Sequence, residues 1–306
     1  MEKGKEHKIV VVGSSNTDMV ISADRFPLPG ETIMGHDFMT NQGGKGANQA
    51  VAAARLGGNV VFVGKLGSDA FGTATMQHLK DEGVDITFLR QTSKSPSGVA
   101  LITTVPDGEN SIIVNSGSNA LLSPEDIRSS EDAFVGASIL LMQLETPVDT
   151  LVEAARLAKK HNCYVILNPA PAPKTPLPKE LLENVDLLIP NETEASSISG
   201  MPTGNADDVD KVMDAIERKG VKNVIITVGS HGVVVRNDGK IVTVPAFKVK
   251  AVDTTAAGDT FCGALSVAIC EGKPLNEAIL FANKASSISV MRKGAQMSMP
   301  KRNEID

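Results

Sequence analysis

Six short apolar runs alternate along this chain with stretches of helical periodicity, and this alternation constrains the fold more than any other feature. The runs predict buried strands at 8–12, 59–63, 138–141, 164–167, 186–189 and 223–228. The other stretches predict helices at 46–56, 68–81, 147–161, 192–199, 206–218 and 275–291, with one more after residue 259. Because parallel strands are joined by crossover helices, this order is typical of βαβ units. We therefore predict an α/β fold built on a parallel sheet.

Two segments do not fit this alternation. Residues 19–39 combine prolines and glycines with short strand-like runs, and residues 99–105 and 110–114 flank a Pro-Asp-Gly turn that predicts a hairpin. Short hairpins are not stable alone, so we expect a small β-lid that pairs with the core or with a second copy. We assign the lid to 16–42 and 97–116, and the α/β core to 1–15, 43–96 and 117–306.

Composition excludes several classes of function. The net charge of −6, with no Trp and one Tyr, argues against a nucleic-acid surface, which needs clustered Lys and Arg and stacking aromatics. Three cysteines and the absence of H-x-x-x-H spacing argue against a disulfide framework and a zinc site. No apolar stretch approaches 18 residues, and the run before Gly13 is too short for a signal peptide. We therefore expect a cytoplasmic protein that binds neither membranes nor nucleic acid.

A glycine-rich loop opens the helix predicted at 46–56. It consists of Gly43, Gly44, Lys45, Gly46, Ala47, Asn48 and Gln49. Such a loop offers backbone N–H groups and the positive end of a helix dipole to an anion or polar ligand. It is not a Walker A loop, because Gly46 stands where Ser or Thr would follow the lysine. The alternative is a glycine turn that starts a tightly packed helix.

Polar residues also follow two of the predicted strands. Asn16 and Asp18, just past the first strand, can point to the same side of an extended chain and bond neighbouring hydroxyls of a sugar. Glu145 follows the strand at 138–141. The alternatives are an Asx turn for the first pair and a helix cap for Glu145.

Two later segments lie where strands end. Asn191 suits a helix N-cap. The functional alternative gives Asn191 a contact with a phosphate or with a metal-bound water, and it gives Glu194 the task of holding Mg²⁺ through water. The segment that closes the strand at 223–228 is Thr227, Val228, Gly229, Ser230, His231 and Gly232. It is interpreted either as a close approach to a nucleotide or as a tight turn between strands.

The strongest candidate for chemistry precedes the helix after residue 259. The N–H groups of Ala256, Ala257 and Gly258 can converge on an oxyanion or phosphoryl group. Asp259 would sit in the first helical turn, where the dipole favours a negative charge, and could accept a proton from an attacking hydroxyl. The alternative is an aspartate that only caps the helix.

Taken together, the chain resembles the ribokinase/PfkB carbohydrate kinase family over nearly its whole length. The resemblance rests on SSNTDMV, NQGGKGANQAVAAARLG, LMQLETP, LNPAPA, PNETEA, TVGSHG, VDTTAAGDTF and RKGAQMSMP. It implies a three-layer α/β/α sandwich with a mostly parallel sheet of about nine strands, plus a β-lid that forms a homodimer. It also implies ATP-dependent phosphorylation of D-ribose at the 5-hydroxyl.

The resemblance also implies roles for individual residues. The sugar contacts would be Asn16, Asp18, Gly44, Lys45, Gly46, Ala47, Asn48 and Glu145. Asp259 would be the catalytic base, and Ala256, Ala257 and Gly258 the anion hole. The nucleotide contacts would be Asn191, Thr227, Val228, Gly229, Ser230, His231, Gly232, Gly258 and Asn283. Glu194 would act on Mg²⁺ through water. A K⁺ site would use Asp253, Thr255, Ser289, Arg292, Gly294 and Ser298.

Two other functions remain open from the sequence. One is a kinase of the same fold for deoxyribose, fructose or another small sugar. The other is a non-catalytic sugar or nucleotide sensor, which would have no need of a base at Asp259.

Overall fold

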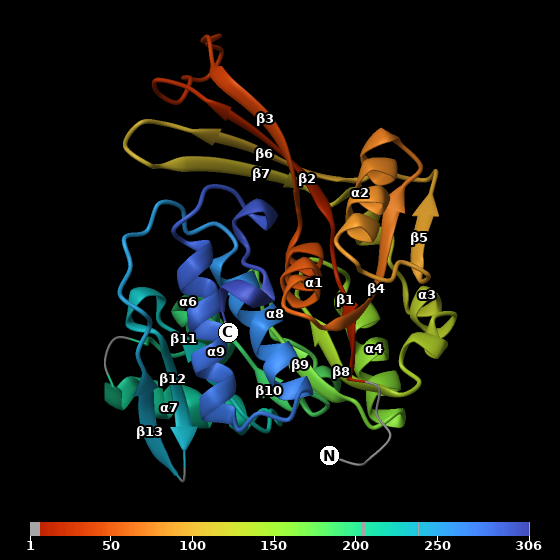
Figure 1. The fold of residues 1–306 in the computed structure, drawn as a ribbon, viewed down its shortest axis with the longest axis vertical. Coiled ribbons are helices and arrows are strands. Elements are labelled where there is room, and N and C mark those ends of the chain that lie inside the picture. The colour runs from red at the N-terminus through yellow and green to blue at the C-terminus, as the bar shows by residue number, and fades with distance from the viewer. Residues whose placement is uncertain (1–6, 204–205, 238, 306) are drawn as a thin grey trace.

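The computed structural model describes residues 7–203, 206–237 and 239–305, and its centre is a six-stranded parallel sheet (Figure 1). The strands are β1 (Lys8–Val12), β4 (Asn59–Gly67), β5 (Leu89–Thr92), β8 (Ala137–Met142), β9 (Tyr164–Leu167) and β10 (Leu187–Leu188). Their order is β10-β9-β8-β1-β4-β5, and all neighbouring pairs are parallel. This confirms the predicted α/β fold.

A second, antiparallel sheet continues this layer. It holds β11 (Ile225–Thr227), β12 (Val233–Asn237) and β13 (Lys240–Val244). Isolated parallel bridges, Leu188 to Val224 and Asn191 to Thr227, link β10 to β11. The expected mostly parallel sheet of about nine strands is thus present as a parallel sheet of six strands and an antiparallel sheet of three, joined by these bridges. The sequence analysis placed no strands at β12 and β13.

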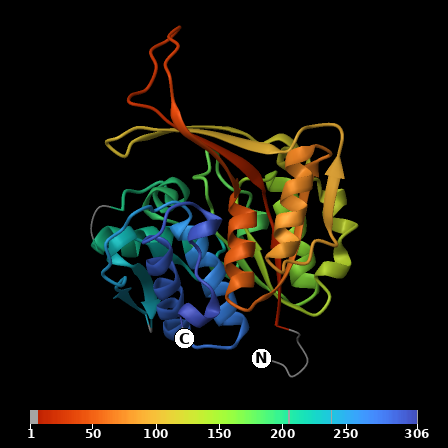
Figure 2. The same ribbon diagram turned by 45° about the horizontal axis from the view of Figure 1, so that its top comes forward.

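Helices cover both faces of the central sheet (Figures 1 and 2). One face carries α1 (Lys45–Arg55), α2 (Ala70–Asp81), α8 (Ala257–Cys270) and α9 (Leu275–Ser289). The other carries α3 (Pro124–Arg128), α4 (Val148–Lys160), α5 (Lys179–Leu182), α6 (Glu192–Ser199) and α7 (Ala206–Glu217). Short 3₁₀ helices lie at Gly117–Leu121, Glu131–Ala133, Gly229–His231, Gln296–Ser298 and Arg302–Glu304.

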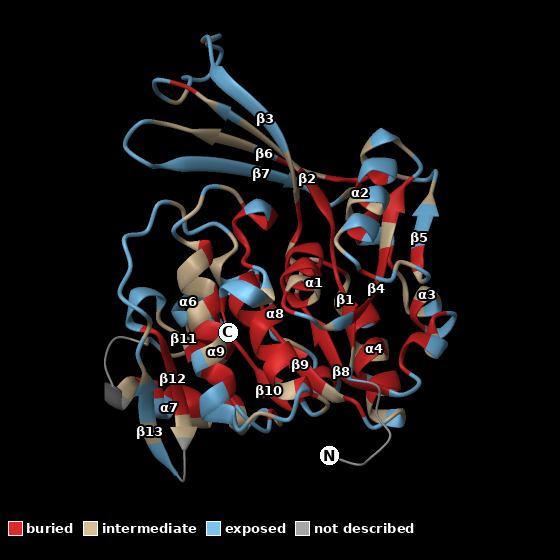
Figure 3. Ribbon diagram, viewed as in Figure 1, coloured by how far each residue is buried: buried red, intermediate tan, exposed pale blue. Residues whose placement is uncertain are grey.

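Strand β1 shows why the molecule has three layers. Successive side chains of a strand point to opposite faces of the sheet. Ile9 and Val11 pack with the helices of one face, whereas Val10 and Val12 pack with those of the other. All four are fully buried, and the burial runs through the middle of the molecule in Figure 3. Apolar residues at the last four positions of the strand thus feed two hydrophobic cores.

The lid is a separate four-stranded sheet that extends from the α/β layers (Figures 1 and 2). Its strands are β2 (Asn16–Ser22), β3 (His36–Gly43), β6 (Gly98–Thr104) and β7 (Asn110–Asn115), in the order β3-β2-β6-β7. β2 and β6 are parallel, and the other pairs are antiparallel. The predicted hairpin around 106–108 is confirmed as β6 and β7. Asn16 and Asp18 lie within β2, so the interpretation of an Asx turn is wrong.

The described residues contain no helix long and apolar enough to cross a membrane. Cys163, Cys262 and Cys270 are buried, and none of them forms a disulfide.

Candidate active site

Several of the predicted ligand-binding residues meet at the carboxyl edge of the sheet, beside the point where strand order reverses. β1 pairs with β4 on one side and β8 on the other, and such switch points open a crevice above the strand ends. There the Ser14 hydroxyl donates to Glu145 Oε2 at 2.5 Å, and the Lys45 N–H donates to the same oxygen at 3.0 Å. Glu145 therefore ties the glycine-rich loop to the ends of β1 and β8.

Gly44 makes this loop possible. Its φ is +86°, a left-handed value that favours glycine, and a Cβ there would lie 2.7 Å from the Ser15 Cα and the Asn16 amide nitrogen. The loop therefore crosses directly over the start of β2, and α1 begins at the next residue, Lys45.

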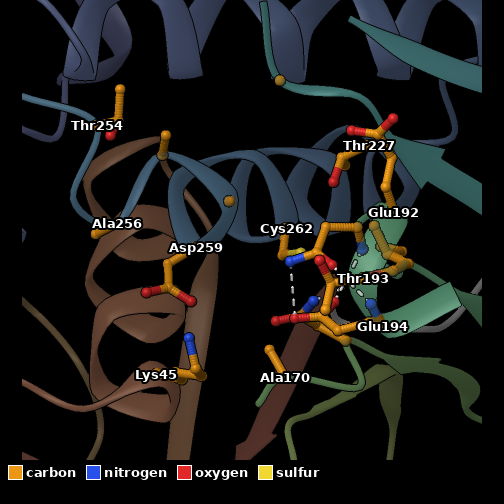
Figure 4. Close-up of a pocket in the computed structure, with 16 residues that line it drawn as sticks. Lys45, Ala170, Glu192, Thr193, Glu194, Thr227, Thr254, Ala256, Asp259 and Cys262 are labelled. Carbon is orange, nitrogen blue, oxygen red and sulfur yellow. Dashed lines mark hydrogen bonds between the residues drawn. The ribbon is translucent and has the colours of Figure 1, made fainter. Parts of the chain in front are cut away.

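A cavity of about 500 Å³ opens at this edge (Figure 4). Its lining residues come from the start of α1, the ends of β9 and β11 and the first turns of α6 and α8. Among them are Lys45, Asn168, Asn191, Glu194, Thr227, Gly229, Ala256, Ala257, Gly258 and Asp259. A cavity of this size suits a small ligand with a nucleotide, and its lining is strongly polar.

Asp259 is the buried carboxylate at the centre of the site, with 6% of its surface exposed. Its Oδ2 accepts a hydrogen bond from Asn48 Nδ2, and its Oδ1 accepts one from Gln49 Nε2, both at 2.9 Å. Its place in the first turn of α8 is as predicted. Figure 4 shows the Lys45 side chain pointing toward it.

Lys45 supplies the positive charge in this group. Burial of Lys45 opposes its charge, but the carboxylates of Asp259, Glu145 and Glu194 outweigh burial and raise its pKa. Lys45 is therefore a fixed cation beside Asp259, facing the cavity.

The start of α8 differs in one detail from the predicted anion hole. The helix begins at Ala257, two residues before the predicted start, and Ala256 precedes it with a left-handed φ of 58°. The Ala257 N–H donates to the Thr254 carbonyl at 3.2 Å and so is already engaged. The N–H groups at the start of a helix have no partner within it, and the space beside the Gly258 Cα is open. The backbone of Gly258 is thus the more accessible donor.

Asn16 is oriented by a residue that the sequence analysis did not identify. Asn119 Nδ2 donates to Asn16 Oδ1 at 2.9 Å, and the Asn119 amide also bonds the backbone N–H and carbonyl of Ser15. Asn16 is buried, with its oxygen occupied. Its amide nitrogen is therefore the group it can offer to a ligand.

Asp18 is half-buried on β2. Its burial and the nearby negative charges of Glu145 and Asp259 raise its pKa to about 7. Asp18 therefore changes its charge close to neutral pH.

On the opposite side of the cavity, Asn191 and Glu194 form a capping box at the start of α6. Glu194 N–H donates to Asn191 Oδ1 at 2.8 Å, and Asn191 N–H donates to Glu194 Oε2 at 2.9 Å. The predicted capping role of Asn191 is confirmed. Glu194 is also buried, which raises its pKa despite the hydrogen bond from Asn191 and the charge of Lys45.

The other predicted nucleotide residues are not all brought to the cavity. Thr227 and Gly229 line it, whereas Val228, Ser230, His231 and Gly232 lie in the turn that joins β11 to β12 without lining it. Asn283, on α9, is buried and donates to the Pro245 carbonyl at 3.2 Å, away from the lining residues.

The residues expected to hold K⁺ form one connected loop region beside α8. Asp253 Oδ1 accepts the Thr255 N–H and its Oδ2 accepts the Gly294 N–H, both at 2.9 Å. The Asp253 N–H donates to the Val290 carbonyl at 3.2 Å. Burial of Asp253 acts to raise its pKa, but the hydrogen bonds from Thr255 and Gly294 outweigh burial and lower it. Arg292 N–H donates to the Ser289 carbonyl, and the Ser298 hydroxyl to that of Ala295.

No group of three or more His, Cys, Asp or Glu able to hold a metal occurs among the described residues. A metal at this site would therefore need ligands from elsewhere, such as water, backbone carbonyls or phosphate oxygens.

Several buried amides around Asp259 were missed by sequence reasoning: Gln49, Gln143, Asn168 and Gln296. Each lies inside one of the motifs quoted above. The motifs alone gave no sign that these side chains contact one another.

Comparisons with known proteins agree with this arrangement. The family model described as pfkB family carbohydrate kinase matches residues 6–302. A ribokinase of Haemophilus influenzae is 44% identical over 296 residues, which cover 97% of this chain and 96% of that protein. A deoxyribokinase of Salmonella typhi is 36% identical over 292 residues, covering 95% of each. A solved structure of Arabidopsis thaliana ribokinase complexed with ribose and ATP has a TM-score of 0.91 at 39% identity, covering 97% of this chain and 96% of that one.

Proposed function

The chain belongs to the pfkB family of carbohydrate kinases, and from this premise we propose that it phosphorylates D-ribose at the 5-hydroxyl. ATP is the phosphoryl donor, and the products are D-ribose 5-phosphate and ADP. The observation that carries the proposal is Asp259, a buried carboxylate beside Lys45, at the floor of a polar cavity and in the first turn of a helix.

In this reaction the 5-oxygen of ribose forms a bond to the γ-phosphorus of ATP, and the bond to the β,γ-bridging oxygen breaks. Asp259 accepts the hydroxyl proton. The N-terminal backbone of α8, with Gly258 as its accessible donor, stabilises the negative charge on the transferring group. Lys45 neutralises part of the negative charge on the transferring phosphoryl group. Phosphoryl transfer requires mainly such positioning and neutralisation.

The sugar would bind between the lid and the glycine-rich loop, with Asn16, Asp18, Asn48 and Glu145 as its polar contacts. Asn16 offers its amide nitrogen, because Asn119 occupies its oxygen. The alternative substrate is 2-deoxyribose, since a deoxyribokinase is among the relatives. A site built to bond a hydroxyl rejects an analogue that lacks it by up to about 10⁴-fold. We therefore propose a clear preference for ribose.

Two metal ions are part of the proposal. Mg²⁺ would be held by the phosphates and by water near Glu194. Both carboxylate oxygens of Glu194 already accept hydrogen bonds from Asn191, which agrees with contact to the metal through water. K⁺ would be held by Asp253 and carbonyls of the adjoining loop; the Thr255 and Gly294 N–H groups that donate to Asp253 fix its carboxylate between these segments. Mg²⁺ would supply charge neutralisation on the phosphates.

Glu194→Gln should raise the Mg²⁺ concentration that gives the half-maximal rate. An unchanged Mg²⁺ requirement would exclude Glu194 from this role.

The deciding experiment is Asp259→Asn, because asparagine is nearly isosteric and cannot take the proton. ADP formation with ribose and MgATP should show a kcat lower by about 10²- to 10⁴-fold, with little change in KM for ribose. If Asp259 were only a cap, its loss would cost about 1 kcal/mol of stability at most and little activity. A soluble variant with more than about a tenth of wild-type kcat would exclude the base role.

The same assay distinguishes the substrate and the sensor alternatives. Wild-type kcat/KM for ribose should exceed that for 2-deoxyribose and for fructose. Equal values for ribose and deoxyribose would contradict the ribose assignment. Absence of ADP formation with every sugar would favour a sensor.

We further propose that the protein is a cytoplasmic homodimer joined through the lid. The three buried cysteines, none in a disulfide, agree with a reducing compartment, and exposed apolar residues on the lid agree with a contact between copies. Sedimentation of the wild-type protein tests the dimer, and fractionation of the native cell tests the compartment. Recovery outside the cytoplasm would contradict the second proposal.

A further inference from the structure

Both hydrogen bonds to the Asp259 carboxylate come from consecutive residues of α1, but the two donors have different surroundings. Asn48 is expected to contact the sugar. Neither residue lines the cavity, but Asn48 keeps 7% of its surface exposed whereas Gln49 has none. A ligand can therefore compete for the Asn48 amide, whereas it cannot reach Gln49.

The orientation of the Gln49 amide is fixed by its neighbours. Asn168 Nδ2 donates to the Ile189 carbonyl at 2.8 Å, so Asn168 presents its Oδ1 to Gln49 Nε2 at 3.0 Å. Gln143 Nε2 donates to Gln49 Oε1 at 2.6 Å. With its oxygen facing one donor and its nitrogen facing two acceptors, the Gln49 amide can direct only its NH₂ group toward Asp259.

A carboxylate fixed through one oxygen can still rotate about its last side-chain bond, because that torsion is broad. Hydrogen bonds to both oxygens of Asp259, at 2.9 Å each, fix the plane of the group. When a sugar hydroxyl draws on Asn48, the bond from Gln49 remains. Misplacement of a reacting group by about 1 Å can cost about 10²-fold in rate.

We propose that Gln49 is a positioning residue that holds the Asp259 carboxylate in the orientation required for proton transfer throughout turnover. It touches neither sugar nor nucleotide and acts only through Asp259. The inference rests on the proposed role of Asp259 as the base. It extends that role to a residue whose side chain is hidden from the cavity.

The first test is Gln49→Met, which keeps the length of the side chain and removes both polar groups. We expect kcat to fall by about 10- to 100-fold, with KM for ribose and ATP changed by less than about threefold. The matched control is Thr150→Val on α4, which removes another fully buried side-chain hydrogen bond, from Thr150 Oγ1 to the Leu122 carbonyl. This control should lose stability and retain kcat. A Gln49→Met loss smaller than tenfold would overturn the inference.

The second test places Gln49→Met in the Asp259→Asn background. Because Gln49 acts through Asp259, the double variant should be no slower than Asp259→Asn alone. A further loss as large as that of the single Gln49 variant would overturn the inference. The proposed function is tested by a different result: an active Asp259→Asn enzyme would exclude Asp259 as the base, whatever the effect of substitutions at Gln49.

If Gln49→Met does not fold, Gln49→Glu decides the matter, because it is nearly isosteric. Its carboxyl can donate to Asp259 while protonated and repels it once ionised. The kcat–pH profile of this variant should acquire a descending limb that the wild type lacks. A profile parallel to the wild type at similar kcat would show that this contact does not position the base.

Discussion

At the scale of single residues, Asp18 gives the site a charge that changes near neutral pH. Its pKa of about 7 reflects burial first and the charges of Glu145 and Asp259 second. A carboxylate accepts a sugar hydroxyl best when ionised, so ribose should bind more weakly below pH 7. Between pH 8 and pH 6 the KM for ribose should rise about tenfold, as expected for the loss of one required ionisation. The KM for ATP, measured in parallel, should change much less.

The same group makes a prediction for stability. The folded-state pKa of Asp18 lies above its ordinary value of 3.8, so the folded protein holds an extra proton between about pH 4 and pH 7. Its contribution to stability is therefore present at low pH and lost as pH rises through 7. Asp18→Asn should raise the free energy of unfolding at pH 8 by on the order of 1 kcal/mol, since partial exposure screens the effect.

Chemical denaturation at pH 5 and pH 8 measures this difference, with Asp24→Asn as the control. The Asp24 side chain, just past the far end of β2, is 95% exposed. An Asp18→Asn protein whose stability and ribose KM vary with pH as the wild type does would contradict the assignment.

The limits of prediction are also clearest among single residues. Asp259 and Asn48 were found because small residues before a helix and a glycine-rich loop have a physical meaning within one segment. Gln49 could not be identified in this way. Its partners Gln143, Asn168 and Asp259 lie 94, 119 and 210 residues away in the sequence. Only the packing of α1 against α8 and the ends of β8 and β9 brings these groups together.

At the scale of elements, the contact between α1 and α8 sets the position of Asp259. At Gly263 a Cβ would lie 2.7 Å from both the Ala52 Cβ and the Gln49 carbonyl oxygen, so α1 and α8 approach more closely than any side chain allows. Gly263→Ala should push the helices apart and weaken the hydrogen bonds to Asp259. We expect a loss of about 1–3 kcal/mol in stability and a lower kcat.

Thermal unfolding and steady-state kinetics measure both effects. The control is Ser266→Ala on the same helix, which removes a hydroxyl that bonds the Cys262 carbonyl of its own turn. This control should retain wild-type kcat. If Gly263→Ala also retains wild-type kcat, the contact between α1 and α8 does not control the geometry of Asp259.

The segment around Asp253 carries a second prediction at this scale. Its carboxylate ties the loop before α8 to the loop after α9, so a cation bound there would order residues 254–258 without touching the sugar. The rate should be higher in K⁺ than in tetramethylammonium at equal ionic strength. Asp253→Asn should reduce this difference. Identical wild-type rates in both salts would exclude K⁺ as an activator.

Elements with a strong hydrophobic pattern were predicted well. The runs that became β1, β8 and β9 are buried on both faces, and their apolar residues are continuous. The hairpin of β12 and β13 was missed although β12 begins with a short buried run, Val233 to Val235; β13 is largely exposed and offers no such run. Its position next to β11 depends on bridges to β10 that no local signal encodes.

At the scale of the whole molecule, the lid carries large apolar side chains that stay exposed and are not covered by the α/β core. Asp18 pairs with Ala100 across β2 and β6, so Leu101 lies on the opposite face of the sheet. Leu101 pairs with Ile113 of β7, and both are more than half exposed. An apolar row of this kind on a thin sheet is typical of a contact between proteins.

The last prediction is that this row joins two copies of the chain. A two-fold contact places the same patch on both partners, so a charge at Leu101 or Ile113 would face its own copy or an apolar surface. Leu101→Lys with Ile113→Lys should therefore shift the sedimenting species from dimer to monomer. Val135→Lys, at another exposed apolar residue between α3 and β8, should leave it unchanged. Because Asn16 and Asp18 belong to the same sheet as this row, separation of the copies should also raise the KM for ribose, through loss of support for β2. A wild-type monomer would contradict the dimer itself, and a dimer that survives both charges would place the contact on another surface.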